Sequence, residues 1–554
     1  MEERRLLLAV ALSLVVLTAY SLLFAPAPPP SSPIPSPSAT PVAAPARQAL
    51  PSPPPEAEER PHAPAAVVAD ERERRVEVQA PDYAVAFTNR GARPVSWTLA
   101  RYLDGRGAPE EMIPAQTAAV RPLDVETGDP AIDARLRGAL YRPSAEAVRV
   151  DGAEPKTIRF TWSDGDLTAE KELSFRASGL VGVTVSVTRG GQPVARRLLW
   201  GPGVGNATPE EREVRGYEEP SAVALAPRGV ETFAAAKLPA TGQTIEGVRW
   251  VGVKSHYFAA LFVAPGGAAG AAVRAVAVPV TGDEKPVSAA VAAIDASEPV
   301  QLFVGAKDYP TMAKLGHELE RVVQVGDWIG PIVVALMRLL RWVQAHVGNW
   351  GWSIVLLTVL INLAMAPFRH YGIVNGLKMA KLSPEMRAIQ ERYRKLKLPL
   401  MDPRRQQMQE EVAALYARHG MSMGSQMAVG CLPLLLTMPF LFAFYRVLAV
   451  SIELRGAPFL WIADLAQKDP LFLTPVLMGA SMFAMQKMSP STLDPAQQRI
   501  MMLMPVMLAG MFLWAPAGLN LYWLTSNLCS ILQQGISMRL LHPDVRPGRD
   551  KRAK

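Results

Sequence analysis

Two hydrophobic patterns divide this chain of 554 residues. From about residue 76 to residue 304, apolar and polar residues alternate in short runs that Gly, Pro and Asp separate. Further along, the chain contains mostly apolar runs, of which several are long enough, as helices, to cross a bilayer about 30 Å thick, while the shorter ones would need a locally thinned membrane. These runs occupy residues 351–368, 428–449, 471–488, 500–515 and 518–537. The chain therefore predicts a β-rich domain followed by a bundle of membrane-spanning helices.

The first region predicts an antiparallel β-sandwich of about 230 residues, since no long helical periodicity interrupts its strands. Its strand-like runs include YAVAFTN, TIRFTW, VGVTVSVT, AVRAVAVPV and PVQLFVG. A glycine-rich stretch, Gly201–Asn206, lacks the last glycine of the dinucleotide-binding fingerprint, and no strand–helix unit surrounds it. We therefore expect a loop there, and this region shows no catalytic motif.

The N-terminus predicts an uncleaved membrane anchor. Arg4 and Arg5 precede an apolar run, Leu6 to Phe24, which is longer than the core of a typical signal peptide. A cleaved signal peptide is the alternative, but Pro28 would follow the cut and hinder it. The two arginines should hold this end in the cytoplasm. From Ala25 to Pro64 there are 15 prolines among Ala and Ser, which favours an extended spacer.

Between the two regions, residues 327–352 predict an amphipathic helix. Arg338 and Arg341 share one helical face, and tryptophans stand at or near both ends of the segment. The apolar face consists of Ile332, Leu336, Leu339, Val343 and Val347. Such a composition is typical of a helix that lies in the membrane interface. A buried core helix of the β-rich domain is the alternative.

Charge placement predicts the orientation, because positively charged loops stay in the cytoplasm. Residues 369–427 contain 11 Lys and Arg against 5 Asp and Glu, and the tail from Arg539 contains six against two. The 451–470 loop contains two basic and three acidic residues. Six spans with both termini cytoplasmic satisfy these counts and place the β-rich domain on the exported side. The predicted parts are an anchor at 1–24, a linker at 25–70, a β-domain at 71–325, an interfacial helix at 326–349, a helical core at 350–540 and a basic cytoplasmic tail at 541–554.

The large cytoplasmic loop predicts a basic helical hairpin at residues 370–426. Two apolar stripes at helical spacing, from Leu382 to Leu396 and from Met408 to Leu415, flank Pro399 and Pro403. The basic residues of the first arm are Lys378, Lys381, Arg387, Arg392, Arg394 and Lys395. One interpretation is a docking arm for acidic partners such as ribosomal RNA. The other is a solvated loop that packs on itself, and charge alone does not separate them.

The sequence offers little for catalysis. Its two cysteines, Cys431 and Cys529, lie in apolar runs and form neither a disulfide framework nor a CxxC pair. The seven histidines show no metal-binding spacing, and neither a nucleophile elbow nor a phosphate-binding loop is present. No span has Asp or Glu in its middle, which argues against proton-coupled transport. We expect no enzyme activity, no cofactor and no metal.

The spans instead contain uncharged polarity in matching stripes. One face of the first core run and its continuation contains Thr358, Asn362, Met365 and Arg369. The same offsets on the last run give Tyr522, Ser526, Cys529 and Gln533, and Ser481 adds a hydroxyl on another run. These stripes either bond the helices to one another or face each other across a wet cavity.

Several long motifs resemble the YidC membrane protein insertases of Gram-negative bacteria. They include VGNWGWSIVLLT, CLPLLLTMPFLFAFY, SIELRGAPFLWIADLAQKDP and the run from PVLMGASMF to LCSILQQ, with SHYFAALFVAP and FVGAKDY in the β-domain. The resemblance is dense from Trp328 to Gln534 and weaker, but collinear, through the β-domain. It implies an inner-membrane insertase and chaperone with five core helices around a hydrophilic groove. It also implies a periplasmic β-supersandwich and a cytoplasmic hairpin that receives substrate.

The resemblance also implies residue roles and partners. Thr358, Tyr522 and Trp523 match groove positions that contact substrate, with Trp523 in place of the second of two tyrosines. Asn362 stands where the family usually has the groove arginine, and Arg369, on the same stripe, is the candidate to replace that charge. The expected groove set is Thr358, Asn362, Arg369, Ser481, Tyr522, Trp523 and Ser526. The implied partners are nascent membrane proteins, the ribosome, the Sec translocon and the lipid bilayer, with no small-molecule substrate.

The expected function is passive insertion. A nascent hydrophobic segment docks at the hairpin, enters a groove open to the cytoplasm and to lipid, and leaves sideways into the bilayer, alone or with the translocon. Two other classes stay open at this point. One is a solute transporter or channel with an exported binding domain, and the other is an assembly scaffold that binds clients without inserting them.

Overall fold

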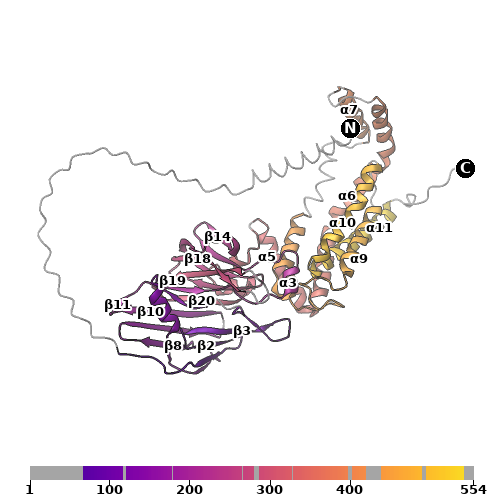
Figure 1. Cartoon of the computed structure of the whole chain (residues 1–554). Helices are drawn as coiled ribbons and strands as arrows, with labels where there is room; N and C mark the ends of the chain where they lie inside the picture. The colour runs from indigo at the N-terminus through magenta and orange to yellow at the C-terminus, as the bar shows by residue number, and fades with distance from the viewer. Residues whose placement is uncertain are drawn as a thin grey trace, which may run out of the picture. The chain divides into compact units, whose positions relative to one another are not determined.

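A computed structural model gives the fold. It describes residues 66–115, 120–177, 179–264, 266–279, 286–326, 328–396, 402, 404–419, 438–488 and 495–541. The predicted anchor at 1–24, the linker up to residue 65, the first part of the 428–449 run and the tail beyond Leu541 lie outside the described residues. Within the described ranges, a β-rich region precedes a bundle of long helices, in the order that the hydrophobic patterns predict (Figure 1).

Three sheets contain the strands of the β-domain. The largest consists, in spatial order, of β14 (Gly229–Ala234), β13 (Ser221–Ala226), β16 (Trp250–Lys254), β17 (Phe258–Val263), β20 (Val300–Ala306), β10 (Leu180–Arg189), β9 (Leu167–Phe175), β8 (Lys156–Ser163) and β6 (Arg142–Pro143), with β11 (Gln192–Pro193) paired to β10. The second consists of β4 (Pro109–Glu111), β3 (Arg93–Leu103), β2 (Tyr83–Thr88), β1 (Arg75–Gln79) and β7 (Ala147–Arg149). The third consists of β15 (Gln243–Val248), β18 (Ala269–Val278), β19 (Val287–Asp295), β12 (Arg197–Trp200) and β5 (Val125–Glu126).

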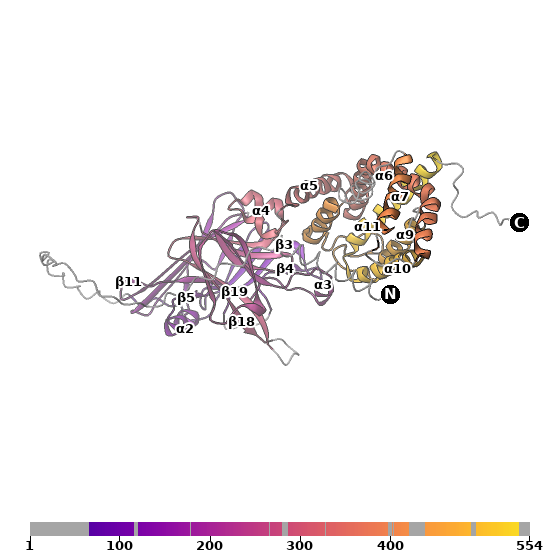
Figure 2. The ribbon, with the colours of Figure 1, turned by 90° about the horizontal axis from the view of Figure 1, so that it is seen from above.

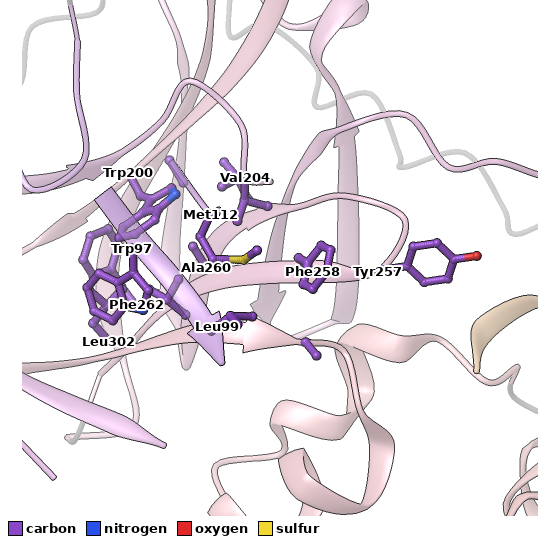
Figure 3. Close-up of a cluster of buried hydrophobic side chains, with 14 of the residues drawn as sticks. Trp97, Leu99, Met112, Trp200, Val204, Tyr257, Phe258, Ala260, Phe262 and Leu302 are labelled. Atoms are coloured by element: carbon purple, nitrogen blue, oxygen red, sulfur yellow. The ribbon is translucent and has the colours of Figure 1, made fainter. Parts of the chain in front are cut away.

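One hydrophobic core joins the three sheets. Phe87 on β2 packs against Phe160 on β8 with ring centroids 5.8 Å apart, so the second sheet covers the largest one. Trp97 on β3 meets Trp200 on β12 edge to face at 6.0 Å, and both are fully buried, which brings the third sheet into the same core. Figure 3 shows these two indoles close to Met112 and Phe262. The period-two pattern therefore builds layered sheets, as the sequence predicts.

Two features of the β-domain differ from the sequence prediction. β1 and β7 pair in parallel, whereas only antiparallel pairing was expected. Parallel neighbours need a long crossover, and residues 80–146 supply it. Short helices also interrupt the strands: α2 (Pro130–Gly138), α3 (Pro209–Glu213) and α4 (Tyr309–Leu315). Each begins with a proline in its first turn after an Asp or Thr cap, and each is too short to show a periodicity in the sequence.

A buried ion-pair cluster joins the β-domain to the helical region. Arg455 lies in the loop that follows the Met438–Val450 helix. Its guanidinium pairs with Glu211, 2.5 Å away, and with Glu110 of β4, 2.8 Å away. All three side chains are almost fully buried, so water and salt screen these pairs only weakly. Each charge depends on its partners, because an unpaired buried charge is costly.

The residues that follow Glu211 continue this attachment, and we call residues 211–218 the docking segment. Glu213 pairs with Lys468, which lies in the same loop as Arg455. Arg215 donates its backbone N–H to the carbonyl of Trp514 at 2.8 Å. One stretch of the β-domain therefore contacts both the loop after the Met438–Val450 helix and the turn before the last helix.

Glu218 ends the docking segment among cations. Its carboxylate lies 3.2 Å from Lys307 Nζ, 3.4 Å from Lys254 Nζ and 3.7 Å from the guanidinium of Arg446 on the Met438–Val450 helix. Burial raises the pKa of Glu218, but these three cations outweigh burial and hold the pKa at about 2. His256 Nδ1 accepts a hydrogen bond of 3.1 Å from the Glu218 backbone N–H. Burial and the nearby cations lower the pKa of His256 to about 4, so the ring is neutral at pH 7.

Helix α5 (Gly330–Val347) forms where the amphipathic helix is predicted and ends at Gly348, whose φ of 76° only glycine adopts readily. Its buried face differs from the prediction and consists of Gly330, Val333, Leu336, Met337, Leu340 and Val343. Leu339 and Val347, predicted on the apolar face, are each 38% exposed, and Trp342 is 59% exposed. The prediction assumed one apolar face, whereas α5 has two: one packs on the protein and the other is exposed.

Helix α6 (Trp350–Lys395) is one continuous helix of 46 residues. Asn349 caps its start, because its side chain accepts a hydrogen bond of 3.1 Å from the Trp352 backbone N–H. α6 contains both the predicted span at 351–368 and the first arm of the predicted hairpin, and it runs through Pro367 and Pro384. A proline removes one helical hydrogen bond without forbidding the helix, so it did not mark an end.

The remaining helices are Met438–Val450, α7 (Arg404–Arg418), α9 (Leu473–Met488), α10 (Pro495–Met511) and α11 (Ala517–Leu541). α11 packs against α6 and α9, and α9 packs against α10. At Gly479, a Cβ would lie 2.7 Å from the Ala509 Cβ, so these two helices need glycine there. Among the described residues, length and hydropathy mark Trp350–Val374 as a candidate membrane span. The Met438–Val450 and Met501–Trp514 helices are apolar but shorter.

Candidate functional site

The polar stripe of α6 begins with two buried side chains that bond their own helix. Thr358 Oγ1 donates to the Ile354 carbonyl at 2.6 Å, and Asn362 Nδ2 donates to the Thr358 carbonyl at 2.7 Å. These bonds, each to a carbonyl four residues earlier, satisfy the donors inside α6. The Oδ1 atom of Asn362 is left as an acceptor for groups from elsewhere.

Arg369 reaches back along α6 to that acceptor. Its Nη1 donates to Asn362 Oδ1 and also to Ser530 Oγ on α11, at 2.9 Å. Ser526 on α11 donates to the same Asn362 oxygen at 3.3 Å. The described residues place no carboxylate against this guanidinium. Because a guanidinium is always charged, an uncompensated positive charge lies at the level of Asn362.

Two further hydrogen bonds continue the contact between α6 and α11. Gln533 Nε2 donates to the Ala366 carbonyl at 2.6 Å, and His370 Nδ1 lies 3.1 Å from Ser537 Oγ. We call this contact the α6–α11 seam, and its residues are Asn362, Ala366, Arg369 and His370 with Ser526, Ser530, Gln533 and Ser537. The α11 residues keep the predicted offsets of 4, 7 and 11, but counted from Ser526 instead of Tyr522. Sequence reasoning missed Ser530 and Ser537, although the same spacing identifies them.

The other expected groove residues on α11 lie outside the seam. Tyr522 stacks on Phe444 of the Met438–Val450 helix, with ring centroids 4.2 Å apart. Trp523 packs edge to face, at 4.8 Å, on the phenylalanine that follows α10. Both rings therefore fill space between helices. Cys529 lines a hollow beside the seam without bonding α6.

Ser481 belongs to a second polar contact. Its hydroxyl donates to the Met478 carbonyl at 2.6 Å and accepts a hydrogen bond of 3.0 Å from Asn527 Nδ2. Both Ser481 and Asn527 are buried. α11 thus bonds α6 with one face and α9 with another, and Asn527 is a polar residue that sequence reasoning missed. Of the expected groove set, the structure brings together Thr358, Asn362, Arg369 and Ser526.

A hollow of about 480 Å³ opens beside the seam. Asn362 and Gln533 line its polar side, while Leu363, Leu532 and Ile536 line its apolar side. Leu363 is 68% exposed and Leu532 is 65% exposed. Such a site can bond the polar groups of a guest chain while the apolar part of the guest contacts its surroundings.

Helix α7 folds back on the C-terminal half of α6 (Figure 1 and Figure 2). Leu382 and Met386 of α6 pack with Leu415 and Tyr416 of α7. Four of the predicted basic side chains of this arm are exposed: Lys381, Arg387, Arg392 and Lys395. The side chains of Lys378 and Arg394 lie outside the described residues.

The chemistry of the seam is that of hydrogen bonding. Its hydroxyl, amide and guanidinium groups suit peptide groups and carboxylates. In the ranges that the structure describes, no group of three or more His, Cys, Asp or Glu side chains is placed to hold a metal ion.

Family models match both halves of the chain. A model described as YidC periplasmic domain matches residues 75–339, and one described as 60Kd inner membrane protein matches residues 342–544. The membrane protein insertase YidC of Geobacter metallireducens is 31% identical over 551 residues, which cover 96% of this chain and 97% of the relative. That of Geobacter sulfurreducens is 32% identical and covers 82% of this chain and 84% of the relative.

A solved structure of an active YidC insertase, with its first transmembrane domain resolved, also aligns with the chain. The alignment covers 85% of this chain and 95% of that one, at 17% identity and a TM-score of 0.35. The sequence relatives, rather than this likeness, decide the family.

Proposed function

The chain belongs to the YidC family of membrane protein insertases, an inner-membrane family with a periplasmic domain, and from that premise we propose that the α6–α11 seam is the polar wall of its substrate groove. The family is one of insertases rather than classical enzymes. The observation that carries the proposal is the position of Arg369, which bonds Asn362 and Ser530 beside an open hollow.

When a client enters, the polar groups of the seam replace their hydrogen bonds to one another with hydrogen bonds to the client. Polar groups that flank a hydrophobic segment would each cost several kcal/mol if they met hydrocarbon without a partner. Hydrogen bonds between helices in a membrane are worth about 0.6–2 kcal/mol, so the seam can open to a guest at modest cost. The apolar part of the client meanwhile faces Leu363 and Leu532, and its burial in lipid, at about 25 cal/mol per Å², drives release.

Arg369 supplies the charge of the groove. Its hydrogen bonds to Asn362 and Ser530 use one of its terminal nitrogens, Nη1. A guanidinium has five N–H donors, so others are available to a client carboxylate. Clients with acidic segments should therefore depend on Arg369 more than neutral ones do.

We further propose six spans with both termini in the cytoplasm. The charge counts of the 369–427 loop and the tail support this orientation. α9, with 16 residues, is about 24 Å long and falls short of a bilayer core of about 30 Å, which fits a locally thinned membrane. The exposed Trp342 supports a place for α5 in the membrane interface.

The pair formed by α7 and the C-terminal half of α6 is proposed as the cytoplasmic hairpin that receives clients. Its buried apolar contact and its exposed basic side chains support this role. An exposed basic surface attracts ribosomal RNA, so we propose the ribosome as a partner here, and the Sec translocon as a partner of the spans.

Reconstitution tests the proposal. Purified full-length protein in liposomes should insert a short single-span client, measured by protection of the client from added protease, without nucleotide. Solute flux without insertion would indicate a transporter or channel instead. Client binding without insertion would indicate a scaffold.

A further inference from the structure

A second hollow, of about 540 Å³, lies on the β-domain, outside the seam. We call it the arginine pocket, because its charged lining consists of Arg228, Arg249 and Arg321 with one carboxylate, Glu318. Three positive charges minus one negative charge leave a formal charge of two positive units. The insertion mechanism proposed above uses none of these residues.

Turns of the backbone bring the three arginines together. Arg228 lies in the turn between β13 and β14, and Arg249 immediately precedes β16. Glu318 and Arg321 belong to the start of η2 (Leu319–Val323). Glu318 takes a left-handed conformation with φ of 56°, which places its carboxylate between two arginines. The cluster is therefore built from three separate segments of the chain.

The positive charges of the arginine pocket are incompletely matched. Arg321 lies 2.7 Å from the Glu318 carboxylate, and Arg249 pairs with that same group. Arg228 pairs with no carboxylate in the part of the chain that the structure describes. Exposed ion pairs are weak, so a phosphate can share Arg249 and Arg321 with Glu318 or replace it. Guanidinium groups match phosphate oxygens with two parallel hydrogen bonds.

The lining of the arginine pocket belongs in part to a hydrophobic cluster that meets the end of a membrane helix. Leu225, which lines the pocket, and Trp250, which follows Arg249, belong to this cluster, and Val450 packs against it. Val450 ends the Met438–Val450 helix, and Arg446, one turn earlier, donates to the Gln324 carbonyl at 2.7 Å. Because the β-domain is periplasmic, this helix end lies at the periplasmic face of the inner membrane, where lipid phosphates are found.

We propose that the arginine pocket binds the phosphate of an anionic phospholipid headgroup from the periplasmic leaflet. The doubly positive lining favours a net-negative headgroup, such as phosphatidylglycerol, over a zwitterionic one. Such a lipid anchors the β-domain to the membrane surface at a place separate from the groove. A soluble phosphate ester offers the same chemistry and is distinguished by competition.

The test uses the full-length protein in phosphatidylcholine nanodiscs that contain a small fraction of photoactivatable phosphatidylglycerol. After illumination, the labelled peptides are identified by mass spectrometry. We expect label on the turns that contain Arg228 and Arg249. The double substitution R228Q/R321Q should reduce labelling about 25-fold, since each basic residue near a membrane surface contributes about fivefold. The matched control R75Q/R101Q removes two exposed arginines of β1 and β3 and should leave labelling unchanged.

A second variant separates binding from folding. Glu318→Gln removes the competing carboxylate and should increase labelling several-fold, whereas a merely structural role for Glu318 predicts no increase. Labelling that is equal in R228Q/R321Q and the parent would overturn the proposal. Full competition by sn-glycerol-1-phosphate at a concentration equal to the lipid probe would also overturn it, in favour of a soluble phosphate ester.

Discussion

Arg369 and Asn362 lie seven residues apart on α6, yet the guanidinium of the first bonds the amide oxygen of the second. Seven residues are about 10.5 Å along a helix, which a long arginine side chain can cover. The charge therefore lies at the amide, although the backbone that supplies it lies two turns later. A motif with arginine at position 362 does not match this sequence, although the structure places the guanidinium of Arg369 beside that position.

Replacing Arg369 should affect clients according to their charge. In the R369A variant, we expect insertion of a client with an acidic tail to fall about tenfold. This corresponds to the loss of one charged hydrogen bond, and a neutral client should lose far less. Protease protection in proteoliposomes measures both. The variant N362R/R369A moves the positive charge to position 362 and should restore the insertion of clients with acidic tails. Equal losses for both clients would mean that Arg369 only holds α6 to α11.

Asn362 should be accessible to water if it belongs to the proposed groove. A cysteine at position 362, in a chain whose Cys431 and Cys529 are replaced by serine, should react with a soluble thiol reagent added to inverted vesicles. The matched control is Leu357→Cys, because Leu357 is fully buried on the same helix. Mass spectrometry counts the modified chains. Equal protection of both positions would show a dry helix contact instead of a groove.

Removing Arg455 should loosen the β-domain from the helices. Arg455→Ala leaves Glu110 and Glu211 buried without their cation, and a broken buried pair costs about 3–5 kcal/mol. Lys468→Ala breaks an exposed pair and should cost about 1 kcal/mol or less. Thermal unfolding of the full-length protein in detergent compares the two variants. Adding E110Q and E211Q to the Arg455 variant should recover part of the loss, and a failure to do so would argue against the charge mechanism.

Acid should weaken the same attachment through His256. Its pKa is 6.5 in an unfolded chain and about 4 in the fold, so between these values only the unfolded state takes up the proton. Stability therefore falls as the pH drops from 6.5 toward 4, by up to about 1.4 kcal/mol per pH unit. Glu218, with a pKa of about 2, adds a loss only below about pH 4.5. In H256Q, the unfolding temperature should change less with pH above pH 4.5 than it does in the parent protein. If the unfolding temperature of H256Q depends on pH as in the parent protein, the loss of stability does not come from His256.

The strands and the polar stripe of α6 were predictable because they follow from local periodicity in the sequence. The alternation in β8, β10 and β18 predicted strands, and helical offsets predicted a polar stripe on α6, on which the side chains of Asn362 and Arg369 bond each other in the structure. The stripe on α11 was off by one turn, because offsets alone do not fix which face meets a neighbour. Of the apolar face expected on α5, Leu336 and Val343 are buried and Leu339 and Val347 are exposed, because the helix packs on the protein with a face turned toward Met337 and Leu340.

The attachment of the β-domain to the helices could not be predicted, because it depends on contacts between residues that are far apart in the sequence. Glu211 and Arg455 are 244 positions apart, and neither residue type nor spacing links them. The docking segment, with three glutamates and two arginines among its eight residues, shows no motif in the sequence that marks it as a contact. Its role becomes visible only when Lys468 and Trp514 are seen on the other side.

Because α6 is unbroken, its C-terminal half, which packs on α7, and its part of the seam belong to one helix. Lys395 and Arg369 are 26 residues apart, or about 39 Å along the helix. Between them, Pro384 is the one residue that has no backbone N–H to donate. We therefore expect a partner that displaces the C-terminal end of α6 to tilt the helix at the seam as well. A flexible loop in the same place would not pass that displacement on.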